Sequence, residues 1–474
     1  MTNNLCLAVL VLIVLSVNQT LHANVKDSLL TYEVPSKLLY SQHNDDFTVK
    51  VRKPGHEWKD LYEYKVEVDM DTKSSASMVY FDFTGTVEIM IRKNNGMIHQ
   101  VAIRPRAQDI IHQLKNNMIY FSLNKPTKLS IEIDGDKLHN LHLFANAIES
   151  NPIDPDDPNV IYFGPGYHEP KDPTQKFYNI PSNKTVYIHG SAVVNGKLLC
   201  KNVRNVKICG RGILFQPERG VEVTNSENII IDGITVINPK HYTVFGGATK
   251  GLTINNLNSF SSQGWSDGVD LMSCSDVSID GVFMRNSDDC IAIYAHRWDF
   301  YGNAHHIQIK NSTLWSDIAH TTNIGLHGYV KEGHPGDTIE QVSFTNIDIL
   351  EHDEDDRNYQ GCMSINASDN NYIRDVTYEN VRVDDFQEGQ LFNIRIVYNE
   401  KYSKAPGRSI ENIVFKNISY NGMEANPSII KGYSADRKIG NITFQNLKIN
   451  GKKVSEASEI PLIIGPFVEN VSFP

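Results

Sequence analysis

The sequence lacks an excess of positive charge. It holds 45 Lys and Arg against 56 Asp and Glu, which gives a formal net charge of -11 at pH 7. A nucleic-acid partner calls for a basic surface that matches its phosphates. We therefore expect no nucleic-acid partner.

Long apolar runs are also rare. One extends from Leu5 to Val17 and is followed by polar residues and Ala23, a pattern typical of a secretory signal peptide over residues 1–23. No other segment approaches the roughly 18 to 20 apolar residues that cross a bilayer. We expect a secreted or periplasmic protein with no membrane insertion.

Cysteine is scarce and scattered. Cys6 lies inside the predicted signal peptide, and the other five show no C-x-x-C spacing. These five are Cys200, Cys209, Cys274, Cys290 and Cys362. We expect buried, unpaired side chains, with one disulfide as the alternative, and neither a metal site nor another cofactor.

Residues 24–148 alternate apolar and polar positions in short runs such as 65-KVEVDM-70 and 87-VEIMIRK-93, separated by turn residues. This alternation predicts an antiparallel β-sandwich. The Pro- and Asp-rich stretch 151-NPIDPDDPN-159 then predicts a linker over residues 149–160. Calcium binding by its aspartates is the alternative.

Residues 161–474 repeat one strand pattern, apolar-x-apolar with Asn or Gly beside it. It occurs at 205-NVKICGRG, 228-NIIIDGI, 251-GLTINNL, 276-DVSIDGV, 306-HIQIKNS, 341-QVSFTNI, 375-DVTYENV, 412-NIVFKNI and 441-NITFQNL. The intervals are 23, 23, 25, 30, 35, 34, 37 and 29 residues, which indicates a solenoid. Helical periodicity and the leucine-rich skeleton are missing. The predicted fold is all-β, a right-handed parallel β-helix preceded by a small antiparallel β-sandwich domain.

A second strand in each coil carries ionisable residues. Aligning these strands on their last apolar residue stacks His241, Asp267, Asp289 and His320 in successive coils. Carboxylates about 5 Å apart repel, and this raises a pKa. Asp288 sits beside the column at the strand entry. Inverting glycoside hydrolysis needs an acid and a base roughly 6.5 to 9.5 Å apart, and we expect this set to supply both.

Four segments resemble the N-T-D, D-D, G-H-G and R-I-K motifs of the polygalacturonases of glycoside hydrolase family 28. They are 265-WSDG-268, 287-SDDC-290, 319-AHT-321 and 364-SIN-366. The carboxylate trio is similar to that of the dextranases and isopullulanases of family 49 as well. The likeness extends over about residues 160 to 450, because 188-IHGSAVVNGK-197 and 208-ICGRGIL-214 also resemble early coils of both families.

The resemblance implies a pectin-lyase-like β-helix in which Asp288 is the general acid. It also implies that Asp267 and Asp289 orient the attacking water and that His320 supports the site. Ser364 and Asn366 stand where a polygalacturonase has Arg and Lys to pair with a galacturonate carboxylate. We therefore expect a substrate other than unsubstituted polygalacturonate.

Further residues are candidates for substrate binding, because sugars stack their apolar faces on rings and hydrogen-bond polar groups. The candidates are His241, Trp265, His296, Arg297, Trp298, Ser364, Asn366 and Arg395. Arg395, one coil after Asn366, is the alternative cation for an acidic sugar. The pair His305-His306 is expected to end an excursion from the coil rather than bind a metal.

These features predict an exported, monomeric glycoside hydrolase that cleaves O-glycosidic bonds of a polysaccharide or oligosaccharide. Two alternatives stay open. One is a polysaccharide lyase on the same fold, and the other is a non-catalytic carbohydrate-binding β-helix module.

Overall fold

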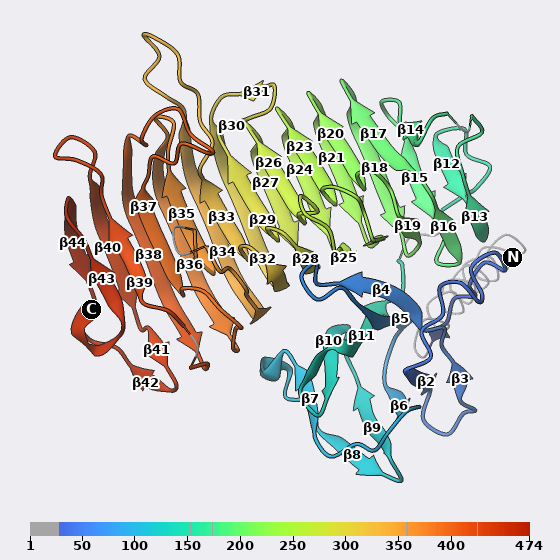
Figure 1. Ribbon diagram of the computed structural model, residues 1–474. Helices are drawn as coiled ribbons and strands as arrows, with labels where there is room; N and C mark the ends of the chain where they lie inside the picture. Colours follow the sequence, from blue (N-terminus) through green and yellow to red (C-terminus); the bar gives the residue numbers. More distant parts are fainter. Residues whose placement is uncertain (1–27, 151–152, 173, 357–358, 424) are drawn as a thin grey trace, which may run out of the picture.

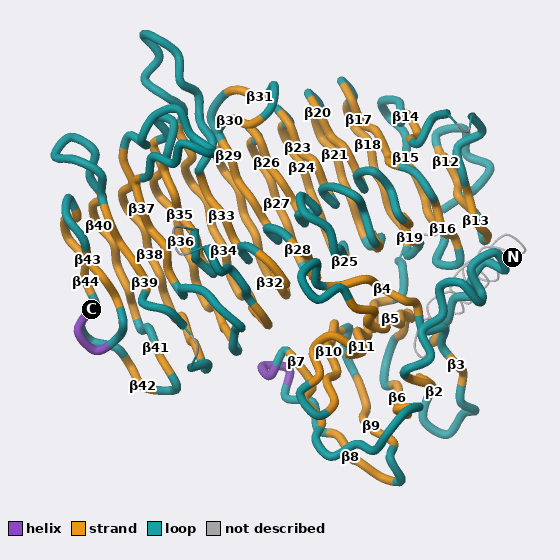
Figure 2. Tube along the Cα trace, in the orientation of Figure 1, coloured by secondary structure: helices purple, strands orange, loops and turns teal. Residues whose placement is uncertain are grey.

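The structure is a computed structural model that describes residues 28–150, 153–172, 174–356, 359–423 and 425–474. The predicted signal peptide, residues 1–23, lies outside the described residues. Among these residues strands dominate, and the two short helical turns are the 3-10 helices η1 (Arg106–Gln108) and η2 (Ala457–Glu459) (Figure 2). Within the described part of the chain, no helix is long and apolar enough to cross a membrane.

The first part of the chain folds into two facing sheets. The six-stranded sheet consists of β1 (Leu29–Leu30), β4 (Tyr64–Val68), β5 (Ser74–Phe83), β7 (Val101–Arg104), β10 (Thr127–Ile133) and β11 (Asp136–Ala147). The five-stranded sheet consists of β2 (Phe47–Arg52), β3 (Lys59–Asp60), β6 (Val87–Lys93), β8 (His112–Lys115) and β9 (Met118–Leu123).

The predicted alternation is present in these strands. In β2, for example, every second side chain is buried, and Val49 and Val51 join one apolar core with Ile89 and Ile91 of β6. One pairing differs from the expected antiparallel pattern, because β5 and β11 run parallel. The chain between them crosses through the other sheet, and such a crossover is what parallel neighbours require.

The rest of the chain winds into a parallel β-helix whose coils advance from β12 to β44, with the sandwich lying against its first half (Figure 1). Two sides of the coil form one 20-stranded sheet. Its strands are β12 (Val160–Phe163), β13 (Gly166–His168), β15 (Thr185–Ile188), β16 (Ala192–Val194), β18 (Arg204–Gly210), β19 (Ile213–Phe215), β21 (Glu227–Asp232), β22 (Thr235–Ile237), β24 (Lys250–Asn255), β25 (Asn258–Phe260), β27 (Ser275–Asp280), β28 (Phe283–Ser287), β32 (Ala304–Ile318), β34 (Thr338–Glu351), β36 (Tyr372–Val383), β38 (Ser409–Tyr420), β40 (Ile439–Gln445), β41 (Lys448–Ile449), β42 (Lys452–Lys453) and β44 (Val468–Ser472).

The third side is an 11-stranded sheet that carries the candidate site. Its strands are β14 (Phe177–Asn179), β17 (Lys197–Lys201), β20 (Val221–Thr224), β23 (Val244–Gly247), β26 (Val269–Met272), β29 (Ile291–Tyr294), β33 (Thr322–Gly325), β35 (Met363–Ala367), β37 (Phe392–Ile396), β39 (Ser428–Lys431) and β43 (Leu462–Ile464). A hairpin of β30 (His296–Arg297) and β31 (Phe300–Tyr301) projects from the coil after β29.

The nine-fold repeat predicted the register of the larger sheet correctly. The apolar residue after each repeated Asn position pairs with its counterpart in the next coil, from Val206 with Ile229 through to Ile413 with Ile442. These side chains point inward and form one continuous core. The predicted all-β fold with a parallel β-helix is therefore confirmed. The five described cysteines are all buried and free, so the alternative of a disulfide is not found.

A buried cation joins the sandwich to the β-helix. Nε of Arg285, on β28, donates to Asp317 at 3.0 and 3.2 Å, and its Nη1 donates to Asn140 of the sandwich at 2.8 Å. Its guanidinium carbon lies 4.1 Å from the ring centre of Trp315. The backbone N–H of Asp69, in the loop after β4, also donates to Asp317, at 3.2 Å. This network lies directly behind the strand that leads into Asp288.

Replacing this cation tests how strongly the two parts depend on it. Arg285→Met leaves the Asp317 carboxylate buried without its ion partner, so we expect the free energy of unfolding to fall by about 3–5 kcal/mol. Urea denaturation followed by tryptophan fluorescence measures the change.

The matched control is Arg374→Met, which removes a cation from the half-exposed pair with Glu340. An exposed pair contributes about 0–1 kcal/mol. Equal losses in the two variants would show that the buried network does not stabilise the fold in this way.

Candidate active site

Three consecutive strands of the 11-stranded sheet bring the predicted column together. Val269 of β26 pairs with Ile291 of β29, and Ile291 pairs with Thr322 of β33. Two residues earlier on each coil, this register places Asp267, Asp289 and His320 next to one another. The backbone continues the ladder there, because the N–H of Gly268 donates to the carbonyl of Asp289 and that of Cys290 to the carbonyl of His320, both at 2.8 Å.

Asp288 reaches the same place from a break in the neighbouring sheet. The pairing of β28 with β32 shifts between Asn286 and Ser287, so the strict alternation of the strand ends just before Asp288. Its Oδ2 accepts a hydrogen bond from the N–H of Trp265 at 2.8 Å, and its Oδ1 accepts one from the N–H of Asp289 at 3.0 Å. Both hydrogen bonds fix the orientation of the carboxyl group.

The three carboxylates of Asp267, Asp288 and Asp289 converge on one place. One oxygen from each of Asp267, Asp288 and Asp289 lies within 4.8 Å of the others. Asp288 enters beside Asp289 on the same coil, and this brings one of its oxygens next to those of the other two carboxylates.

The environment divides the three carboxylates by protonation state. Burial raises the pKa of Asp288 to about 6, with the charge of Asp289 acting in the same direction. Burial raises the pKa of Asp267 well above its usual range, and the charges of Asp270 and Asp288 add to this. Asp267 is therefore the carboxyl group that most readily holds a proton.

Asp289 is the ionised member of the set. Burial alone would raise its pKa, but the charge of His320 and hydrogen bonds from His320 and Asn323 outweigh burial and lower it. Nδ1 of His320 lies 2.7 Å from Oδ1 of Asp289, and Nδ2 of Asn323 donates to Oδ2 at 2.8 Å. Burial would lower the pKa of His320, yet the charge of Asp289 and this bond raise it to about 9. At neutral pH the two form an ion pair.

Several residues that contact this set were not predicted from the sequence, among them Tyr294, whose hydroxyl donates to Oδ2 of Asp289 at 3.5 Å. Two others are Asn323 and Asp270, and Asp270 is fully buried with its Oδ2 3.7 Å from Nη1 of Arg297. Burial raises the pKa of Asp270 to about 8 against the opposing charge of Arg297. The side chains of Asn323 and Asp270 point to the outer face of the sheet. On β26, for example, Asp270 lies between Val269 and Leu271, whose side chains point inward. Strand alternation was the signal that could have found Asn323 and Asp270.

A cluster of rings and one cation stands beside the carboxylates. The ring centres of Trp265 and Trp298 are 6.4 Å apart, and the guanidinium carbon of Arg297 lies 5.5 Å and 5.8 Å from them. The tryptophans are 51% and 46% exposed. Both also adopt a left-handed backbone, with φ of 65° and 56°, which is unusual for a bulky residue. Their exposed faces are free to stack on a sugar.

The predicted register of His241 is wrong by one residue. Val244 pairs with Val269, so Tyr242 rather than His241 stands in line with Asp267. The alignment slipped because Phe245 points outward into an aromatic cluster and Gly246 takes the inward position. His241 still borders the site, because its ring centre lies 6.4 Å from that of Trp265 and 6.3 Å from that of Trp298.

His296 has a different place from the one expected. Its Nδ1 lies 2.9 Å from the carbonyl oxygen of Gly328, and its Nε2 lies 3.1 Å from that of Trp298. Its ring also stacks on Tyr301, with ring centres 4.2 Å apart. These contacts tie His296 to Gly328 and to its own hairpin.

The coils beyond His320 continue the site as a neutral polar strip. Asn323 pairs with Ser364, and Asn366 pairs with Arg395 in the following coil. Oγ of Ser364 lies 3.4 Å from Oδ1 of Asn323, and Nδ2 of Asn366 donates to Oγ of Ser364 at 2.5 Å. Arg395 lines a cavity of about 320 Å³ with Asn366 and Tyr359. The cation is thus one coil further from the carboxylates than the two neutral residues.

Comparison with known proteins places the chain in a family. The model of glycosyl hydrolases family 28 matches residues 169–466, most of the β-helix. The chain belongs to glycosyl hydrolases family 28. This confirms the resemblance drawn from the motifs.

Among the curated relatives of this family 28 protein is the probable endopolygalacturonase D of Aspergillus niger. It is 22% identical over 329 residues, which cover 67% of the chain and 59% of the relative. The probable exopolygalacturonase B of Neosartorya fischeri is 26% identical over 223 residues, 44% of each chain. The match therefore spans less than two thirds of either relative's own length.

A solved structure extends the likeness to the whole fold. Dex49A from Penicillium minioluteum superposes with a TM-score of 0.63 at 14% identity, over 91% of this chain and 96% of that one. At this identity the likeness concerns the fold alone. Its coverage shows that the arrangement of the described sandwich and β-helix is shared between the two proteins.

The two opposed pKa shifts predict a pH profile for any substrate that this protein cleaves. In the roles that the resemblance implies, Asp288 acts protonated and Asp289 acts ionised. Asp288 loses its proton above its pKa of about 6. Asp289 stays ionised even at pH values below the usual pKa of an aspartate. We expect kcat/KM to be highest in acid and to fall about tenfold per pH unit above pH 6.

His320→Gln removes the cation that holds Asp289 ionised, so the acidic limb of the profile should move to higher pH. His99→Gln, an exposed histidine of the sandwich, is the matched control and should leave the limb in place. An optimum above pH 8, or an unmoved limb in His320→Gln, would contradict the assigned protonation states.

Proposed function

We propose that the protein is a secreted glycoside hydrolase that cleaves a polysaccharide by single displacement with inversion. The observation that carries this proposal is the convergence of Asp267, Asp288 and Asp289 within 4.8 Å in three different electrostatic environments. A structural turn gains nothing from such a costly grouping of like charges.

Asp288 is the general acid in this proposal. A pKa of about 6 leaves it largely protonated in mild acid, as a group that donates to a leaving glycosidic oxygen must be. The N–H bonds from Trp265 and Asp289 stabilise the carboxylate that remains after the proton has left. They therefore lower the barrier to the transfer as well as fixing the geometry.

Asp289 and Asp267 hold the attacking water. A water that donates hydrogen bonds of about 2.8 Å to two acceptors places those acceptors about 4.5 Å apart, and the neighbouring oxygens of Asp267 and Asp289 are close enough for such an arrangement. Asp289, ionised by His320, takes the proton of the water. Asp267 orients the water, and its buried Oδ1 has no hydrogen-bond partner within the described ranges.

The substrate we propose carries a neutral sugar next to the bond that is cut. Ser364 and Asn366 are uncharged, and they are buried in the strip that continues from His320. A carboxylate beside Ser364 and Asn366 meets no cation on their own strand, because the cation, Arg395, lies on the next coil. Trp265 and Trp298 supply the stacking faces.

The exported location and the domain boundaries belong to the same proposal. The apolar run in residues 1–23 supports secretion, and the alternating pattern of residues 24–148 supports a separate sandwich domain. That domain contacts Arg285, which lies on the strand that leads into Asp288. Its role is therefore to support the catalytic coil.

The direct test is Asp288→Asn, assayed on dextran-like, pectic and algal polysaccharides with products resolved by chromatography. The parent protein should cleave a neutral glucan better than de-esterified polygalacturonate. The variant should lose about 10²–10⁴-fold in kcat, because the amide cannot donate a proton in the same way, while melting at an unchanged temperature.

Asp280→Asn is the control. Asp280 lies on the 20-stranded sheet, where it accepts a hydrogen bond from Asn311, and its replacement should keep full activity. Near-normal turnover by Asp288→Asn would overturn the assignment of the acid. Products that absorb as unsaturated sugars would indicate a lyase instead, and preferred cleavage of polygalacturonate would contradict the neutral subsite.

A further inference from the structure

A ladder of asparagines runs along the 20-stranded sheet, on the residue that precedes the first inward side chain of each coil. Each of these residues adopts a left-handed backbone, and successive side-chain amides are hydrogen-bonded from coil to coil. The asparagines of this ladder are Asn183, Asn205, Asn228, Asn412, Asn441 and Asn470. A short polar side chain that tolerates positive φ suits the position.

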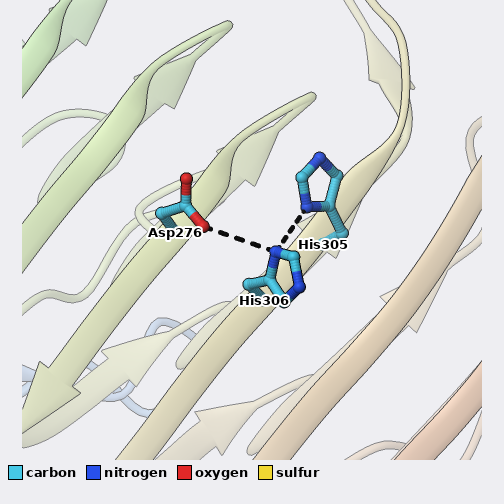
Figure 3. A group of neighbouring side chains, drawn as sticks. All are labelled: Asp276, His305 and His306. Atoms are coloured by element: carbon cyan, nitrogen blue, oxygen red, sulfur yellow. Dashed lines mark hydrogen bonds and ion pairs between the residues drawn. The ribbon is translucent and has the colours of Figure 1, made fainter.

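In the middle of the β-helix, residues other than asparagine occupy the ladder position. In the coils of β27 and β32 its position is taken by Asp276 and His306, with φ of 54° and 55°. His305 precedes His306, and the three side chains converge on one point above the sheet (Figure 3). Neither histidine belongs to the groove, because the carboxylates project from the 11-stranded sheet.

The spacing of the three groups fits a single metal ion. Nδ1 of His305 lies 2.9 Å from Nδ1 of His306, which lies 3.4 Å from Oδ1 of Asp276, and all three ligand atoms are within 4.8 Å of one another. An ion bound at about 2.1 Å by two ligands separates them by about 3.0 Å at a right angle and about 3.4 Å at a tetrahedral angle. Both measured pairs fall on these values.

Hydrogen bonds alone satisfy the group in only one arrangement of protons. The two Nδ1 atoms and the Asp276 oxygen face one another. Only a proton on His306 Nδ1 can be donated both to His305 and to Asp276. A proton on His305 Nδ1 would leave the contact between His306 and Asp276 without a donor, and protons on both facing nitrogens would collide at 2.9 Å. A cation at the centre uses the lone pairs of all three.

We propose that Asp276, His305 and His306 bind one divalent transition metal ion of the kind that imidazole and carboxylate ligands favour, such as Zn²⁺. Asp276 and His306 are exposed and His305 is half-buried, so water completes the coordination. The site joins the coil of β27 to the coil that begins after the β30–β31 hairpin. It therefore closes the loop that carries Arg297 and Trp298 and is structural rather than catalytic.

The test uses the conservative change that the ladder itself suggests. His306→Asn and Asp276→Asn each place the commonest ladder residue at a position whose backbone it tolerates, so the fold should be kept. Zn²⁺ binding to the tag-free, chelator-treated protein is measured by isothermal titration calorimetry. We expect one site in the parent, at least about tenfold weaker in either variant, and a Zn²⁺-dependent rise in melting temperature that the variants lose.

His139→Asn is the control. It removes a surface histidine that lies 3.0 Å from Asp136 but has no second histidine in its group, and it should bind Zn²⁺ as the parent does. Equal binding by His306→Asn and the parent, or no saturable binding by the parent, would overturn the proposal. Circular dichroism of each variant distinguishes loss of the ligand from loss of the fold.

Discussion

The in-register pairing of parallel coils is the constraint on which the rest of this structure depends. Parallel strands lie about 4.8 Å apart, so residues at the same register of successive coils have no choice but to stack. Where the stacked residues are Val and Ile they fill the core, and where they are Asn they form a ladder. Where they are Asp267, Asp289 and His320, the same geometry creates a site with strong electrostatic coupling.

The site is a set of exceptions to the regular coil. Asp288 projects where the pairing of β28 with β32 shifts register. Trp265 and Trp298, next to it, adopt a left-handed backbone. Such exceptions cost free energy, and the surrounding structure holds them in place. The ion pair of Arg285 and Asp317 anchors the strand before Asp288, and the sandwich packs behind that ion pair. The N-terminal sheets therefore belong to the support of the site.

The sequence predicted the features that depend on period and alternation. All nine repeated strands align as predicted, and so do Asp267, Asp289 and His320, because each has clear apolar residues beside it. The alignment failed at His241, where an outward Phe245 imitates an inward residue. The direction of side chains where strand pairing is interrupted could not be predicted, so the position of Asp288 and the contact of His296 with Gly328 emerged from the three-dimensional structure.

The stereochemistry of the first product tests the central claim most directly. An inverting enzyme activates a water with one carboxylate, whereas a retaining enzyme attacks the sugar with a carboxylate directly. Proton NMR of a fresh digest, recorded before mutarotation, identifies the anomer that forms first. Two carboxylates that share one water predict the inverted anomer. Initial formation of the retained anomer would mean that Asp267 or Asp289 attacks the sugar itself, and it would contradict hydrolysis by a shared water.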